Sequence, residues 1–135
     1  MKYLLDTDTI SFALRGQAGV AQRLLAHHPF QLAVSSISVA ELRYGADRKS
    51  SKRLHAVISS FLSPLEIVPF DTNAADLFGR LGSLLAERGT PIGDFDVLIA
   101  AHAVSLKRIL VTNNVRHFSR VPGLKIENWA DPTPL

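Results

Sequence analysis

The segment YLLDTD, residues 3–8, places a short apolar run directly before two acidic residues. A run of this length that ends at polar residues is typical of a short buried strand. A helix is expected to follow at 7–15, because Gly16 ends the pattern. This part of the chain is therefore expected to be a strand, an acidic turn and a helix.

The same order of strand and helix returns further along the chain. Strands are expected at 2–5, 31–34, 65–68, 108–112 and 124–127, and additional helices at 19–27, 39–47, 51–62, 71–88 and 95–106. This alternation predicts an α/β fold with a mainly parallel sheet covered by helices on both faces. Ligands of such sheets bind beyond the carboxyl ends of the strands. The polar residues expected at that edge are Asp6, Ser35, Ser36, Asp71, Thr112, Asn113 and Asn114.

Composition restricts the class of protein. The chain has 135 residues, of which 47% are hydrophobic and 20% charged, so a single globular domain over 1–135 is expected. The absence of cysteine excludes disulfides, thiolate metal sites and thiol nucleophiles. No apolar run is long enough for a signal peptide or a membrane helix, and we expect a cytoplasmic protein. The net charge of +3 permits a polyanionic partner without requiring one.

Several acidic residues near the expected helix starts have structural explanations. Asp6 follows its strand immediately and could cap the next helix, and Asp8 suits a first helical turn. Glu41 lies three residues after Ser38, which is the spacing of a capping box. Glu41 could also point toward Asp6, because its helix is expected to follow a strand beside the first one.

Asp94 and Asp96 open the helix expected at 95–106, and one of them is expected to cap it. Three carboxylates that converge at one edge of the sheet repel one another unless a cation neutralises them. Hard divalent ions such as Mg²⁺ and Mn²⁺ take oxygen ligands. The five histidines lack the spacing of zinc ligands, so core or solvated histidines are expected.

The opening acids have one competing use. Haloacid-dehalogenase-like phosphatases carry the pattern hhhDxDx(T/V), in which the first Asp is the nucleophile and the second the acid/base, and YLLDTDT resembles it. The pattern breaks at Ile10, and the chain offers little length for a cap module. A phosphatase that uses Asp6 is therefore the alternative reading.

Five segments together carry a more extensive resemblance. They are LLDTD at 4–8, SSISVAELRYGA at 35–46, GTPIGDFDVLIAAHA at 89–103, LVTNNVRHF at 110–118 and VPGLKIENW at 121–129. In order and spacing they resemble the PIN-domain ribonucleases, and most closely the VapC-type toxins of bacterial toxin–antitoxin pairs. The resemblance spans nearly the whole chain and implies a PIN-like α/β/α sandwich of three layers.

The resemblance also implies roles for particular residues. Asp6, Glu41 and Asp96 would be the catalytic acids and would hold the metal, Mg²⁺ or Mn²⁺ in its place. The fourth position of the family, often Asp, is Asn114 here and would bind through water. Asp94 lies outside the motif, so it keeps its expected role as a cap.

The activity implied is that of a metal-dependent endoribonuclease that inhibits translation as a toxin, with initiator tRNA as one conceivable target. The implied partners are a VapB-type antitoxin and a second toxin copy, in a homodimer or a heterotetramer. A non-catalytic module that binds a partner is the other alternative. Candidates for contacts with RNA phosphates are Arg43, Arg48, Lys49, Lys52, Arg53, Arg116 and Arg120.

Overall fold

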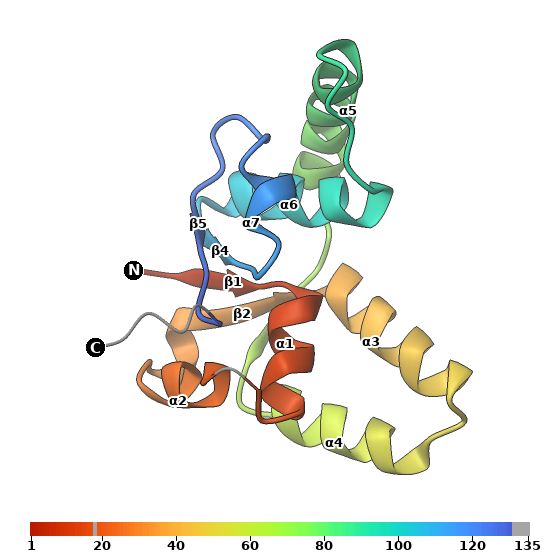
Figure 1. Ribbon diagram of the computed structural model, residues 1–135, viewed down its shortest axis with the longest axis vertical. Coiled ribbons are helices and arrows are strands. Elements are labelled where there is room, and N and C mark those ends of the chain that lie inside the picture. Colours follow the sequence, from red (N-terminus) through yellow and green to blue (C-terminus); the bar gives the residue numbers. More distant parts are fainter. Residues whose placement is uncertain (18, 131–135) are drawn as a thin grey trace.

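Five parallel strands form the centre of the structure, a computed structural model that describes residues 1–17 and 19–130 (Figure 1). The strands are β1 (Tyr3–Leu5), β2 (Leu32–Ser35), β3 (Glu66–Val68), β4 (Ile109–Val111) and β5 (Ile126–Glu127). They lie in the order β3-β2-β1-β4-β5. In the centre of the sheet, Leu4 of β1 is in register with Ala33 on one side and Leu110 on the other.

The helices connect these strands. They are α1 (Thr7–Leu14), α2 (Val20–Leu25), the 3-10 turn η1 (Pro29–Gln31), α3 (Ser36–Arg48), α4 (Lys52–Leu62), α5 (Thr72–Glu87), α6 (Asp94–Leu106) and α7 (Val115–Phe118). Figure 1 shows α1 to α4 on one face of the sheet and α5 to α7 on the other. The expected three-layer α/β fold is therefore confirmed.

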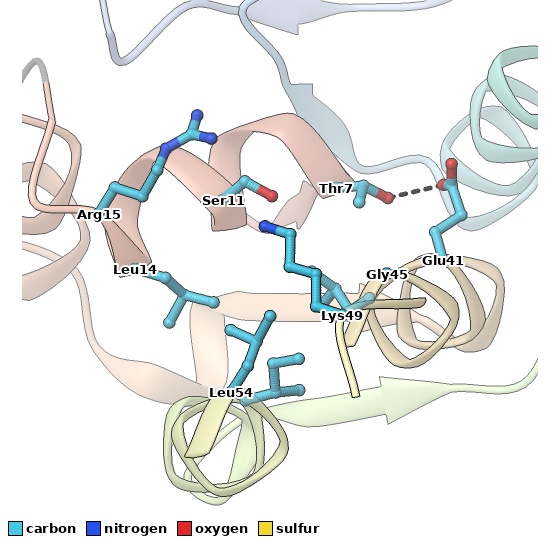
Figure 2. A pocket seen from close by; sticks show the side chains of 10 residues that line it. Thr7, Ser11, Leu14, Arg15, Glu41, Gly45, Lys49 and Leu54 are labelled. Carbon is cyan, nitrogen blue, oxygen red and sulfur yellow. Dashed lines mark hydrogen bonds between the residues drawn. The ribbon is translucent and has the colours of Figure 1, made fainter. Parts of the chain in front are cut away.

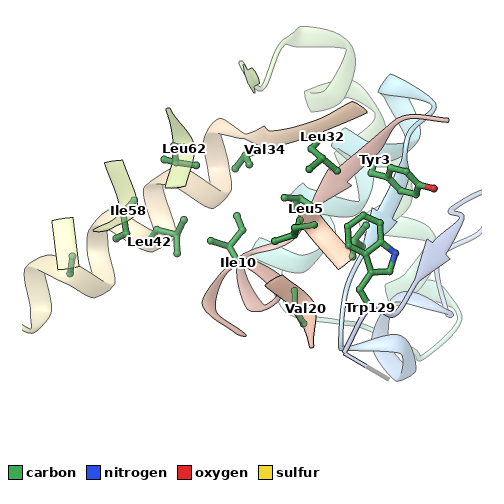
Figure 3. Close-up of a cluster of buried hydrophobic side chains, with 13 residues drawn as sticks. Tyr3, Leu5, Ile10, Val20, Leu32, Val34, Leu42, Ile58, Leu62 and Trp129 are labelled. Atoms are coloured by element: carbon green, nitrogen blue, oxygen red, sulfur yellow. The ribbon is translucent and has the colours of Figure 1, made fainter. Parts of the chain in front are cut away.

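Each face of the sheet has its own hydrophobic core, because successive side chains of a strand point to opposite faces. Tyr3 and Leu5 pack against the layer of α1 to α4 with Ile10, Leu42 and other apolar residues (Figure 3). Leu4 points the other way and packs with residues of α5 and α6. Both faces are covered, so the central strands are buried throughout and read in the sequence as continuous apolar runs.

Two expected helix caps are wrong. Helix α3 begins at Ser36 and not at 39, and its cap is Ser35, whose Oγ accepts from the backbone N–H of Ile37 at 3.0 Å. The capping box between Ser38 and Glu41 is therefore absent, because both residues lie inside the helix. Strand β2 ends at Ser35 and α3 begins at Ser36, so the hydroxyl of the last residue of the strand caps the helix.

Helix α6 also begins differently from the expectation. Gly93 occupies the N-cap position, and no side chain makes a cap hydrogen bond there. Asp94 and Asp96 both lie in the first turn, where a carboxylate interacts favourably with the helix dipole without capping. The short helix α7 was not expected, since four residues carry too little periodicity to indicate a helix. None of the helices in the described ranges is long and apolar enough to cross a membrane.

Candidate metal and catalytic site

Asp6 is the most buried of the candidate acids, with 5% of its surface exposed. It directly follows β1, and its backbone N–H donates to the carbonyl of Val111 in β4 at 3.0 Å. Its Oδ1 accepts from the N–H of Thr9 at 2.8 Å, so Asp6 does cap α1. The cap fixes the carboxylate at the carboxyl end of the two central strands.

Burial dominates the ionisation of Asp6. It raises the pKa of this carboxyl from 3.8 to about 6, while hydrogen bonds from Thr112 and Thr9 act in the opposite direction and the charge of Asp8 adds to the rise. A carboxylate that is hydrogen bonded as a cap and still shifted upward lies in a poorly hydrated place. A bound cation would reverse this shift.

Glu41 comes from the second turn of α3 and faces α1. Its Oε1 accepts a 2.7 Å hydrogen bond from the hydroxyl of Thr7, the residue next to Asp6. Burial raises the pKa of Glu41, the Thr7 bond lowers it, and the charges of Asp96 and Asp8 raise it. The electrostatic influence of Asp96 and Asp8 indicates that these acids share one environment.

Asp96 lies in the first turn of α6, on the other side of the sheet. Burial is the main reason that its pKa is raised, His117 opposes the rise, and Asp8 contributes to it. His117 Nδ1 lies 3.6 Å from Oδ2 of Asp96 and 2.9 Å from Nδ2 of Asn114. Asn114 is thus connected to the acids through His117, at the start of α7.

The four acids Asp6, Asp8, Glu41 and Asp96 line one small pocket of about 30 Å³, together with Thr7, Ile99 and Phe118. Four carboxylates with no Lys or Arg among the lining residues form a donor set of hard oxygen atoms, which fits a small divalent cation. Within the described ranges, however, no three acidic or histidine side chains are arranged closely enough to hold one ion as they stand. Side-chain rotation is needed before these carboxylates can share a cation.

A cleft about 180 Å³ in volume leads away from Glu41 between α1, α3 and α4 (Figure 2). Thr7 and Glu41 lie at one end, and Arg15 and Lys49 also line it. Lys49 is eight residues beyond Glu41 in sequence, about 12 Å farther along the helical direction. The cleft therefore joins the acidic pocket to basic side chains.

The candidate RNA contacts are scattered. Arg48 ends α3, Lys49 follows it, and Lys52 and Arg53 begin α4, so all four lie where these two helices meet. Figure 1 shows this junction at the end of α3 that is farther from the sheet. The Arg43 guanidinium turns to α4, where it donates to the carbonyl of His55 at 3.0 Å and to Oγ of Ser59 at 2.8 Å.

The other two candidates lie near the site. Arg116 is exposed on α7, one residue before His117, and Arg120 donates to the carbonyl of Pro91 at 3.3 Å. Two further residues of the site were missed by sequence reasoning. Thr7 gave no signal beyond its place between two acids, and His117 was expected to be a core or solvated histidine although it lies within a motif of the resemblance.

Acids at the carboxyl edge of this parallel sheet agree with the match of residues 3–124 to the model of the PIN domain, and the chain belongs to this family. The chain is 38% identical over 130 residues to the tRNA(fMet)-specific endonuclease VapC of Salmonella typhimurium, covering 96% of this chain and 98% of that protein. It is 40% identical to Ribonuclease VapC2 of Haemophilus influenzae strain KW20, with the same coverage of both chains. The crystal structure of DNA-bound VapBC from Salmonella typhimurium superposes with a TM-score of 0.89 at 39% identity, covering 96% of this chain and 98% of that chain.

Proposed function

We propose that this protein is a metal-dependent endoribonuclease of the VapC type, the toxin of a toxin–antitoxin pair. The observation that carries the proposal is the pocket in which Asp6, Asp8, Glu41 and Asp96 meet at the carboxyl edge of the sheet. Full-length similarity to proteins named ribonuclease and tRNA(fMet)-specific endonuclease supports the same activity. Family membership weighs against both the phosphatase and the non-catalytic binding module.

Asp6, Glu41 and Asp96 are proposed to hold Mg²⁺, with Mn²⁺ as a substitute, and Asn114 to contribute through water. When bound, such a cation activates water for attack on a phosphodiester and stabilises the charge that develops on the phosphate. Asp6 and Asp96 supply charge from opposite layers of the fold. Glu41 would either complete the set of ligands or accept a proton from the attacking water.

The positively charged residues serve substrate approach in this proposal. The basic residues at the junction of α3 and α4, with Arg15 in the cleft, would guide the RNA backbone toward the acids, and Arg116 and Arg120 would contact it from α7. Arg43 is the weakest member of this set, because its guanidinium already bonds to α4.

The biological partners follow from the relatives. We infer a VapB-type antitoxin that covers the acidic pocket, a toxin homodimer or heterotetramer, and action on tRNA in the cytoplasm. Initiator tRNA is the proposed target, because a relative of 38% identity bears that specificity in its name.

The test is cleavage of a total tRNA pool by the protein freed of antitoxin, with Mg²⁺ or with EDTA, and with Asp96→Asn as the matched variant. Discrete products that need Mg²⁺ and vanish in Asp96→Asn are expected, and sequencing their ends identifies the target. Cleavage that persists in EDTA or in the variant would contradict the proposal, as would the absence of products under all conditions.

A further inference from the structure

A second charged feature lies at the opposite edge of the sheet, where the strands begin. Each of three adjacent strands, β1, β4 and β5, is preceded by a basic residue: Lys2, Arg108 and Lys125. The backbone bonds of the sheet bring them together, since the N–H of Ile109 donates to the carbonyl of Lys2 at 3.1 Å, and the N–H of Leu110 donates to the carbonyl of Lys125 at 2.9 Å. Three neighbouring strands therefore start from one basic row.

Lys107 adds a fourth basic residue from the end of α6. It adopts the left-handed conformation with φ of 56°, which is unfavourable for a residue with a Cβ. The N–H of Lys107 donates to the carbonyl of Val104, and the N–H of Arg108 donates to the carbonyl of Ala103. This pair of hydrogen bonds is common at helix ends, and glycine is preferred at the position that Lys107 occupies. A lysine here interacts favourably with the last carbonyls of the helix, but a basic residue before the cap would do the same without the strain.

These residues surround an open hollow, which we call the rear basic pocket. Its volume is about 570 Å³, and its lining consists of Met1, Lys2, Ala103, Val104, Lys107, Arg108, Ile109, Gly123 and Lys125. No acidic residue is among them. The other lining residues are apolar or glycine, and every ionisable side chain of the lining is basic.

The lysines of the rear basic pocket form no ion pairs with the rest of the described residues, whereas its arginine does. Arg108 is occupied, since its guanidinium donates to Oε1 of Glu66 at 3.2 Å and to the carbonyl of Tyr3 at 3.3 Å. Lys2, Lys107 and Lys125 are exposed, and none of the ion pairs among the described residues includes them. Three unpaired lysines around one hollow favour an anionic ligand that approaches from solvent.

We propose that the rear basic pocket binds the phosphate backbone of the RNA substrate, at a place separate from the cleavage site. The inference rests on the proposed nuclease function, which supplies a polyanion long enough to reach both edges of the sheet. Asp96 lies in the first turn of α6 and Lys107 directly follows its last residue, so the two are eleven residues and about 16 Å apart along the helix axis. Lysine ammonium groups contact phosphates as point charges without reading bases, so this contact favours long or folded RNA over short fragments.

The test compares the binding of bulk tRNA by Asp96→Asn protein with and without the added triple change Lys2→Gln, Lys107→Gln and Lys125→Gln. Fluorescence anisotropy titrations in EDTA at several salt concentrations give the slope of log affinity against log salt. Loss of three phosphate contacts is expected to reduce this slope by about 2 to 3. Affinity at low salt should fall in parallel.

A matched control removes the same charge elsewhere, with Arg23→Gln, Arg80→Gln and Arg88→Gln on the exposed surfaces of α2 and α5 and just beyond α5. Circular dichroism melts establish that both triple variants are folded. In proteins with Asp96 intact, the lysine variant should also lower the ratio of the cleavage rate of tRNA to that of a short fragment containing the same cut.

The outcomes separate this inference from the proposed function. Equal slopes for the lysine and control variants would show an effect of net charge alone and would overturn the pocket. The binding of inorganic phosphate is titrated in the same variants. If the lysine variant keeps the salt slope of RNA binding and loses only the binding of inorganic phosphate, the pocket binds a small anion, and the proposal of an RNA contact is overturned. If protein with Asp96 intact cleaves no RNA and the Asp96→Asn protein binds none, the proposed function fails, and the inference fails with it.

Discussion

The hydroxyl of Thr7 donates a 2.7 Å hydrogen bond to Oε1 of Glu41, and so joins the first turn of α1 to α3 across the acidic pocket. A hydrogen bond to a charged group contributes about 1.5 to 3 kcal/mol. Thr7→Val is therefore expected to slow single-turnover cleavage of tRNA by about tenfold or more, because Glu41 loses its fixed position. Thr7→Ser keeps the hydroxyl and should restore most of the rate, and equal rates for Val and Ser would contradict this role.

The buried charge of Asp6 should lower the free energy of unfolding in the absence of metal. Its pKa rises from 3.8 to about 6, which corresponds to about 3 kcal/mol of unfavourable free energy for the charged form at neutral pH. Asn can still cap α1, so Asp6→Asn is expected to melt at a higher temperature than the wild type in EDTA. Added Mg²⁺ should raise the melting temperature of the wild type and leave the variant unchanged.

The control for that prediction is Asp6→Ala, which removes the charge and the cap together. It should be less stable than Asp6→Asn by about 1 kcal/mol. A melting temperature of Asp6→Asn that still rises with Mg²⁺ would show that the ion binds without Asp6.

Lys107→Gly is expected to stabilise the fold by up to about 1 kcal/mol, because glycine adopts the left-handed conformation without strain. Urea denaturation gives the free energy of unfolding. Ser105→Gly, two residues earlier in the regular part of α6, is the matched control and should destabilise, since glycine disfavours a helix interior. A less stable Lys107→Gly protein would mean that the lysine side chain contributes more to the helix end than the backbone strain removes.

His102 should make the stability of the fold depend on pH. It is buried on α6, with Nδ1 2.8 Å from Oγ of Ser35 and its ring edge-on to Phe70. Burial lowers its pKa below the ordinary 6.5, and the charge of Arg108 acts in the same direction, against Asp71 and a backbone contact with Pro69. Below the ordinary value the unfolded chain binds a proton that the folded chain resists, so stability falls with falling pH.

The measurement is the free energy of unfolding of wild type and His102→Gln between pH of about 5 and about 7.5. Asp6 has the opposite sign in this range, since its raised pKa stabilises the fold as the pH falls. The contribution of His102 is therefore taken from the difference between the two proteins, with the exposed His28→Gln as the control. A difference that stays constant with pH would contradict the prediction.

The order of strands and helices could be predicted from the sequence because apolar runs and helix-ending residues are local signals. The cap of α1 could also be predicted, but those of α3 and α6 could not. The segment SSIS offers three hydroxyls within four residues, and only the end of β2 against its neighbours decides that Ser35 is the cap. Four-residue α7 gives no period at all.

The three candidate acids Asp6, Glu41 and Asp96 were selected with the help of a family resemblance, and the structure brings them to one pocket. The residues that contact these acids could not be predicted from the sequence, for a physical reason. The Thr7–Glu41 bond depends on how α1 packs on α3, and the approach of His117 to Asp96 depends on how α7 lies on α6. Such contacts between elements leave no trace in local composition.

The two outer strands of the sheet are very short: β3 has three residues and β5 has two. A long unpaired edge is a template on which another chain can add a strand, and short edges remove most of that template. The fold is therefore protected against edge-to-edge aggregation at moments when no partner covers it. An antitoxin that added a strand to either edge would form few backbone hydrogen bonds, because these strands are so short. The fold therefore favours recognition of an antitoxin through side chains of the helical layers.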